Sequence, residues 1–363
     1  MKNSFGNQLT LTLFGESHGE YIGAVIDGLT PGVAIDHESI KNALQKRRPR
    51  GKMATARVEA DEYKIISGEH NGKATGTPLT IIIPNQNTKS GDYSALENTP
   101  RPSHADYTAE LKYHGYQDKR GGGHFSGRIT AALVAAGGII MPMLEKKGIR
   151  IATHISKFES IKDVDFNNLA EDIKILKERD FPTISREAEE KMISLGEAVR
   201  TEGDSIGGVL ETVVAGVPGG VGEPWFDTVE GLLAHAVFSV PAVKGIEFGK
   251  GFDFADMRGS LANDAYEIKD GQVYTKTNNN GGINGGITNG MPIIFRSAVK
   301  PTPSISLEQD TVNLATSENT KIKIEGRHDS AIIQRIAPVI DAVTALTIAD
   351  LLIGRFGTDY FAD

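Results

Sequence analysis

Four short segments of the chain place histidine, arginine, serine or aspartate among glycines. They read F-G-E-S-H-G at residues 14–19, R-P-S-H-A-D at 101–106, R-G-G-G-H-F-S-G-R at 120–128 and E-G-R-H-D at 325–329. Glycine lets the backbone approach a ligand, while arginine, serine and histidine donate hydrogen bonds to phosphate and carboxylate oxygens. Core packing has little use for that chemistry. We therefore expect the four segments to converge on one site for an anionic, phosphate-bearing molecule.

A fifth segment lies nearer the C-terminus. Residues 278–290 form an asparagine and glycine tract that allows left-handed backbone and would, alone, be typical of a flexible loop. A strand predicted over residues 292–299 leads from it into K-P-T-P-S at 300–304, where a lysine, two hydroxyls and two rigid prolines suit a phosphate or a ring system. Neither G-x-G-x-x-G after a strand nor G-x-x-x-x-G-K-[ST] occurs, so dinucleotide-binding and P-loop folds are not favoured.

The histidines divide into two groups. Five of them are better interpreted as turn residues or satisfied hydrogen-bonding groups, namely His37, His70, His114, His154 and His235. By contrast, His18, His104 and His328 each have serine, arginine or aspartate within two residues. Each motif alone would fit a turn as well as a site, so only their joint occurrence indicates a function.

Composition excludes several classes of protein. The chain has 363 residues, 39% hydrophobic and 24% charged, which is ordinary for a globular protein. A formal charge of −8 argues against a nucleic-acid binder, and the absence of cysteine excludes disulfides, thiolate catalysis and cysteine-ligated metals. No signal peptide is evident, and the apolar run 336–353 contains Asp341 and Asp350, which is typical of a buried helix rather than a membrane span. We expect a soluble cytoplasmic protein without a metal.

Regular elements must position these motifs. Residues 8–13 alternate as a half-buried strand and deliver the first histidine motif onto a loop, and a helix over 105–113 places His104 at its start, where the helix dipole favours an anion. Residues 128–147 are apolar all round, which predicts a helix buried on both sides. The other predicted elements are helices from Asp36 to about Arg48, from Ser185 to about Thr201 and over 332–353, and strands over 77–84, 207–217 and 243–248. They follow no βαβ rhythm.

Together the motifs resemble the chorismate synthase family over nearly the whole chain, from residue 14 through the helix after 329. The matching segments are G-E-S-H-G at 15–19, R-P-x-H-A-D-Y-T at 101–108, E-G-D-S-I-G at 202–207, V-P-x-G-x-G-E-P at 217–224, K-P-T-x-S at 300–304 and G-R-H-D at 326–329. The resemblance implies one catalytic domain over residues 1–363 with an α+β fold, a β-α-β sandwich with long buried helices between antiparallel sheets, usually assembled as a homotetramer.

The resemblance also implies an activity. The family converts 5-enolpyruvylshikimate 3-phosphate to chorismate and phosphate by an anti-1,4 elimination that needs reduced FMN without net oxidation. His18 suits the acid that protonates the leaving phosphate, because such a group must neutralise developing charge. By resemblance, His104 hydrogen-bonds or protonates the flavin and Asp329 relays the C6 proton. Ser17 and Ser126 are expected to act as hydroxyl relays.

Binding residues follow from the same motifs. Guanidinium groups bind carboxylates and phosphates bidentately, so substrate or NADP binding is expected at Arg47, Arg48 and Arg128. FMN contacts are expected at His124, Phe125, Ser126, Pro241, Ala242, Gly285, Lys300, Pro301, Thr302, Pro303, Ser304 and Arg327. No further segment of domain size is present for a flavin reductase, so reduced FMN is expected from a separate enzyme. A direct NADPH role rests on the resemblance at Arg47 alone.

The chain departs from the family pattern at three places. The usual G-G-G-R-S-S-A-R-E-T reads G-G-G-H-F-S-G-R-I-T at 121–130, so His124 and Phe125 replace an arginine and a serine. Pro241 stands where asparagine is common, and R-H-D-P-C reads R-H-D-S-A at 327–331. Two other classes stay open from the residues alone: a flavin-dependent oxidoreductase, which would consume reductant, and a non-enzymatic phospho-ligand binding module.

Overall fold

Two five-stranded antiparallel sheets frame the protein, whose computed structural model describes residues 2–49, 51, 53, 60–86, 98–324 and 329–362. The first sheet has the order β1 (Ser4–Phe5), β2 (Thr10–Gly15), β3 (Tyr21–Asp27), β7 (Leu79–Pro84) and β4 (Lys64–Ser67). The second has the order β11 (Val243–Phe248), β16 (Ile293–Val299), β10 (Gly208–Ala215), β8 (Arg150–Phe158) and β9 (Ile161–Lys162).

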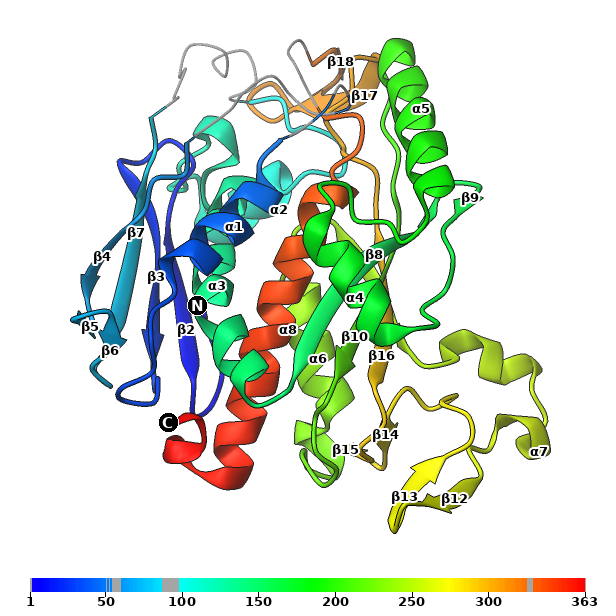
Figure 1. Cartoon of the computed structure of the whole chain (residues 1–363). Helices are drawn as coiled ribbons and strands as arrows, with labels where there is room; N and C mark the ends of the chain where they lie inside the picture. The colour runs from blue at the N-terminus through cyan, green and yellow to red at the C-terminus, as the bar shows by residue number, and fades with distance from the viewer. Residues whose placement is uncertain are drawn as a thin grey trace.

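Long helices fill the space between the sheets. They are α1 (His37–Arg47), α3 (Thr130–Lys146), α6 (Val229–Phe238) and α8 (Ile333–Phe356). Helix α3 packs on β3 and β7 of the first sheet and on α8, while α8 packs on β8 and β10 of the second sheet (Figure 1). The expected sandwich of long buried helices between antiparallel sheets is therefore confirmed.

Close packing of α3 depends on two glycines. A Cβ added at Gly137 would lie 2.5 Å from the Cβ of Ala342 in α8, and one at Gly138 would lie 2.6 Å from the Cα of Ile40 in α1. The helical stretch Gly127–Lys146, which contains α3, and helix α8 are each long and apolar enough to cross a membrane, but 83% and 89% of their most apolar windows are buried inside the protein. Both are core helices, as the sequence predicted.

The expected helix caps are present. The Asp36 carboxylate accepts hydrogen bonds from the N–H groups of Glu38 and Ser39, and α1 starts directly after it. The Ser185 hydroxyl accepts from the Ala188 N–H and starts α5 (Arg186–Glu202). Two further helices complete the layers: α2 (Asp106–Tyr113), and α4 (Leu169–Glu178), which packs on β8.

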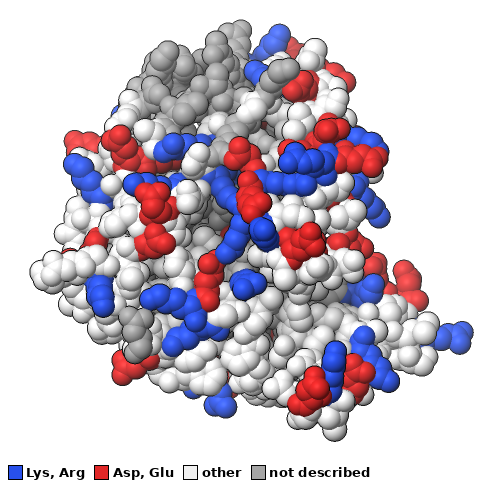
Figure 2. All heavy atoms as spheres, viewed as in Figure 1, with Lys and Arg blue, Asp and Glu red and all other residues white. Residues whose placement is uncertain are grey.

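Short elements surround this sandwich. They are β5 (Glu69–His70), β6 (Lys73–Ala74), α7 (Gly259–Ala262), β12 (Tyr266–Lys269), β13 (Gln272–Thr275), β14 (Ile283–Asn284), β15 (Ile287–Thr288), β17 (Gln309–Asn313) and β18 (Glu318–Ile322). The β12–β13 hairpin projects from the lower right of the molecule in Figure 1. On the face drawn in Figure 2, lysine and arginine lie beside aspartate and glutamate in a band across the middle and in a group at the lower right.

Candidate active site

A cavity of about 980 Å³ collects residues from segments spread along nearly the whole described chain. Its walls come from the β1 and β2 strands, the end of α1, the start of α3, the end of α6 and the inner face of α8. The predicted site residues that line it are Ser17, Arg47, His104, His124, Phe125, Ser126, Arg128, Pro241, Ala242, Lys300, Thr302, Pro303, Ser304 and Asp329. The convergence expected from the sequence is therefore present for these positions.

A run of three glycines separates two of the predicted catalytic histidines. Gly121, Gly122 and Gly123 all have positive φ angles, in the short 3₁₀ segment Arg120–Phe125. A Cβ at Gly121 would lie 2.6 Å from His18 Nε2, and one at Gly122 would lie 3.4 Å from His104 Cε1. Only glycine permits this backbone and this approach. His18 is buried at 7% exposure and lies behind Gly121, outside the lining of the cavity.

His104 is held by an aspartate and an arginine. Its Nδ1 lies 2.7 Å from Asp106 Oδ1 and 3.1 Å from Arg101 Nη2, and Arg101 also donates through Nε and Nη2 to Asp106, at 2.8 Å each. Burial opposes ionisation of Asp106, but the hydrogen bonds from Arg101 and His104 outweigh it and hold the pKa of Asp106 well below its usual range. A carboxylate only accepts, so the contact at 2.7 Å assigns the proton to Nδ1, and Arg101 then acts on the ring through Asp106. Nε2 is left for proton exchange.

The His124 ring is oriented by one backbone contact. Its Nδ1 lies 2.8 Å from the carbonyl oxygen of Gly15. A carbonyl only accepts, so Nδ1 must carry the hydrogen, and the other ring nitrogen is left to accept or, when protonated, to donate. His124 lines the cavity, so this residue of the chain can offer charge there in place of the family's arginine.

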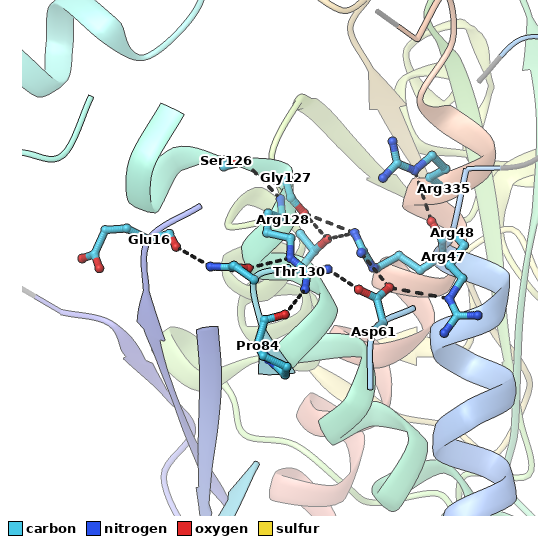
Figure 3. Close-up of polar contacts among 11 residues, drawn as sticks. Glu16, Arg47, Arg48, Asp61, Pro84, Ser126, Gly127, Arg128, Thr130 and Arg335 are labelled. Carbon is cyan, nitrogen blue, oxygen red and sulfur yellow. Dashed lines mark hydrogen bonds and ion pairs between the residues drawn. The ribbon is translucent and has the colours of Figure 1, made fainter. Parts of the chain in front are cut away.

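Asp61 sits at the centre of an arginine cluster that the sequence did not indicate. Its Oδ2 accepts from Arg47 Nη2 at 3.1 Å, its Oδ1 accepts from Arg128 Nη1, and Arg48 Nε lies 3.9 Å from Oδ2 (Figure 3). The side chains of Asp61, Arg47 and Arg128 are 1%, 5% and 8% exposed. Burial opposes ionisation of Asp61, but the two arginine charges prevail and lower its pKa. Two guanidinium groups thus share one carboxylate at the cavity wall.

Arg47 retains one unpaired donor. Its Nε is buried and makes no hydrogen bond to any described residue, although Nη1 reaches the Gly127 carbonyl and the Thr130 hydroxyl at 3.5 Å. Burial lowers the pKa of Arg47 to about 10, with Asp61 opposing that shift and Arg335 and Arg128 adding to it. A buried donor without a partner is costly, and an anion in the cavity would satisfy it.

Asp329 is joined to the same cluster. Arg335 Nη1 lies 2.5 Å from Asp329 Oδ2, and Arg335 Nε donates to the Arg47 carbonyl at 3.1 Å. Asp329 is therefore fixed at the cavity wall by an arginine on the first turns of α8.

A second cationic group lies across the cavity. Lys300 and Lys244 both line it, and burial together with the Lys244 charge lowers the pKa of Lys300. Lys300 Nζ donates to the Ser103 carbonyl at 2.5 Å, and the buried hydroxyl of Thr302 has no hydrogen-bond partner among the described residues. Two lysines and an unpaired hydroxyl suit a phosphate, and the partly exposed Phe125 ring offers an apolar face nearby. These residues fit the phosphate and ring of FMN.

Besides His18, four predicted positions do not line the cavity in the described structure. Gly285 lies in the turn between β14 and β15 and does not line the cavity, and Pro301 does not line it either. Arg48 approaches the site through Asp61. Arg327 lies outside the residues that the structure describes.

Sequence reasoning missed several residues of the site. Arg101 and Asp106 stood inside a quoted motif but had no assigned role, and Lys244 follows the predicted Ala242 by two residues. His235 was interpreted as a turn or satisfied residue, yet it lines the cavity and packs edge-on against Phe5 at 5.2 Å between ring centroids. His154, by contrast, is the satisfied core histidine expected, bonded to Asp163 and Glu211.

Comparison with known proteins gives one consistent family. A protein-family model described as chorismate synthase matches residues 9–353. The chain is 45% identical over 350 residues to the chorismate synthase of Thermococcus kodakarensis and 47% identical over 350 residues to that of Pyrococcus abyssi, covering 96% of this chain and 97% of each relative. A crystal structure of a chorismate synthase superimposes with a TM-score of 0.75 and 27% identity, covering 97% of this chain and 94% of that one.

Proposed function

Because the chain belongs to the chorismate synthase family, we propose that it converts 5-enolpyruvylshikimate 3-phosphate to chorismate and phosphate by an anti-1,4 elimination that requires reduced FMN. The observation that carries the proposal is the cavity itself. It places an unpaired buried donor of Arg47 and the Lys244–Lys300 pair in one enclosure with His104 and Asp329. A substrate with two carboxylates and a phosphate matches that positive wall.

Each residue has a distinct task in this scheme. His18 donates the proton that neutralises the departing phosphate, with Ser17 beside it as a relay. Arg47, Arg48 and Arg128 orient the anionic groups and lower the charge that develops on the leaving oxygen. Asp329, fixed by Arg335, takes the C6 proton, and Ser126 serves as a second hydroxyl relay.

Reduced FMN supplies electron density to the substrate ring when it is bound. The residues that would hold it are His124, Phe125, Ser126, Pro241, Ala242, Lys300, Thr302, Pro303, Ser304 and, from the motif, Pro301, Gly285 and Arg327. His104, with its Nδ1 proton held by Asp106, would present Nε2 as the group that exchanges a proton at the edge of the flavin.

An anaerobic stoichiometry assay tests the proposal. Elimination removes a proton and a phosphate and leaves the electron count of the substrate unchanged, so a single charge of reduced FMN should support many turnovers. Chorismate and phosphate should form in equal amounts, and oxidised FMN should bind without supporting turnover. Consumption of one reduced FMN or NADPH per product would identify an oxidoreductase instead, and binding of the substrate without any product would leave a binding module.

The wider setting is part of the same proposal. Residues 1–363 act as one catalytic domain, supported by one large buried cluster that runs from Leu9 to Phe361 through both sheets, beside a small second cluster under α4. The chain works in the cytoplasm as a homotetramer and receives reduced FMN from a separate reductase. NADPH would serve as the reductant, with Arg47 the one position that suggests direct contact.

A further inference from the structure

We propose that Asp61 is a positioning residue, which fixes Arg47 and Arg128 so that both face the anionic groups of the substrate. The inference rests on the proposed function of the cavity. Asp61 is placed for this role because each carboxylate oxygen takes a different arginine, Oδ2 from Arg47 Nη2 at 3.1 Å and Oδ1 from Arg128 Nη1 (Figure 3). A carboxylate shared in this way sets the distance between two guanidinium groups.

Charge makes the carboxylate necessary. Arg47 already carries a pKa lowered to about 10, chiefly by burial, with the nearby charges of Arg335 and Arg128 adding to the shift and Asp61 opposing it. Without Asp61, two buried guanidinium groups would repel each other across a low-dielectric wall. Asp61 therefore lets the cavity hold two oriented cations before any anion arrives.

The hydrogen bonds continue from Arg128 to the histidine loop. Arg128 Nε donates to Asn85 Oδ1 at 3.0 Å, and Asn85 Nδ2 donates to the carbonyls of Glu16 at 3.0 Å and Gly19 at 2.8 Å. Those two carbonyls bracket Ser17 and His18 (Figure 3 shows the contact at Glu16). One connected set of contacts therefore places the anion-binding arginines relative to the loop that carries the proposed acid.

The backbone at Asp61 is also unusual. Its φ angle is +48°, a left-handed value that most residues avoid but that aspartate and asparagine tolerate. An Asp61→Asn substitution therefore keeps the shape and backbone preference of the residue while removing its charge. This variant therefore tests the charge of the Asp61 side chain while its shape and position are kept.

The test compares Asp61→Asn with wild type in anaerobic turnover with reduced FMN, calorimetric binding of inorganic phosphate, and thermal unfolding. Misplaced arginines should lower kcat by about 100-fold, the cost of a displacement near 1 Å. The substitution removes one negative charge from the cavity wall, so phosphate should bind to the variant at least as tightly as it binds to wild type. A merely structural aspartate would lower the melting temperature and leave kcat of the folded enzyme unchanged.

Two other variants keep the test decisive. Asp350→Asn is the matched control. Asp350 is 5% exposed, accepts hydrogen bonds from the N–H groups of Asn7, Gln8 and Leu9, and does not line the cavity. Its substitution should therefore lower the melting temperature and leave kcat unchanged. If Asp61→Asn does not fold, Asn85→Ala reaches the same Arg128 from a more exposed position and should lower kcat by about tenfold.

The proposal is overturned if kcat of the folded Asp61→Asn protein stays within about threefold of wild type, which is a change of less than about 0.7 kcal/mol in the activation barrier. If Asp61→Asn does not fold, the same limit applies to kcat of Asn85→Ala. It is equally overturned if phosphate affinity falls in parallel with kcat, because the arginines would then be lost rather than misplaced. If the wild-type protein forms no chorismate, the proposed function is rejected instead. Calorimetric binding of phosphate to the wild-type protein would then still show that the cavity binds anions.

Discussion

At the scale of single residues, the site depends on groups whose positions are set by a partner. His104 is held by Asp106, which Arg101 fixes in turn, and His124 is held by the Gly15 carbonyl. The sequence identified both histidines because glycine, arginine and aspartate surround them in the chain. It gave no sign of Asp61, which has no glycine or histidine beside it and gains its role only where residues 47, 61 and 128 meet in space.

Removing either proposed catalytic histidine should separate chemistry from folding. His18→Ala and His104→Ala should each lower kcat by two to four powers of ten, roughly the range for a positioned acid or base. Circular dichroism and the melting temperature should change little for His104, which is partly exposed. Wild-type turnover in a folded His18→Ala protein would remove that residue from the mechanism.

The glycine next to His18 provides a second residue-scale prediction. Gly121→Ala adds a Cβ that would lie 2.6 Å from His18 Nε2, on a backbone with φ of +61°. The imidazole must move, so kcat should fall by about tenfold or more while the far Lys300 pair is undisturbed. A lowered kcat with unchanged phosphate affinity would support the role of His18 as the acid, and an unchanged kcat would contradict it. Gly127→Ala is the control, since a Cβ there meets nothing within 4 Å.

At the scale of elements, the long apolar helices α3 and α8 and the N-caps of α1 and α5 were predictable, and the small hairpins were not. Asp36 and Ser185 cap helices where the sequence predicted, because capping is a local interaction between a side chain and the N–H groups two or three residues on. The β14–β15 and β17–β18 hairpins follow no clear alternation of apolar residues, and the alternation in β12 buries neither face of that strand. The positions of two-residue strands such as β14 are determined by their turns and by neighbouring segments, and the periodicity of apolar residues does not predict them.

Helix α8 carries a buried carboxyl that should make stability depend on pH. Burial raises the pKa of Asp341 to about 6, although Thr153 donates to its Oδ1 at 2.6 Å. The raised value means that the protonated carboxyl stabilises the fold fully below about pH 4, and that this stabilisation is lost as the pH rises through 6. The loss amounts to about 3 kcal/mol, from two pKa units at 1.36 kcal/mol each.

Asp341→Asn should remove that dependence. An amide stays neutral and can still accept from Thr153, so the variant should be more stable than wild type at pH 7.5 and close to it at pH 4. Urea unfolding at four pH values between 4 and 7.5 measures the difference. The exposed Glu267→Gln change is the control and should leave the profile unchanged. Parallel profiles for wild type and Asp341→Asn would show that the carboxyl ionises freely in the folded protein.

At the scale of the whole molecule, several large apolar side chains are exposed to solvent. Trp225 is 84% exposed, Phe226 96% and Phe252 83%, while Ile268 on the projecting β12–β13 hairpin is 79% exposed. Contiguous patches of such side chains mark interaction surfaces. In the proposed homotetramer, burial of these side chains at a subunit interface would stabilise the assembly.

The single tryptophan of the chain makes this measurable. Trp225 emission should shift to shorter wavelength in the assembled protein and to longer wavelength when dilution separates the subunits. Phe226→Glu should lower the mass found by light scattering, because it places a charge among apolar side chains. Val164→Glu, a charge on an exposed side chain elsewhere, should leave the mass unchanged. Tetramers that persist in Phe226→Glu would place the interface on another face.

The bonds from Asp350 to the N–H groups of Asn7, Gln8 and Leu9 join positions that lie 341 to 343 residues apart in the chain. During synthesis, the strand that begins at Thr10 therefore emerges long before α8, which carries its anchor, is translated. The cavity takes lining from β1 and from α8 alike, so no shorter nascent chain encloses it. A growing chain must therefore keep its first sheet without this partner until α8 is made, and a chain that stops before Ile333 would lack the part of the cavity wall that α8 supplies.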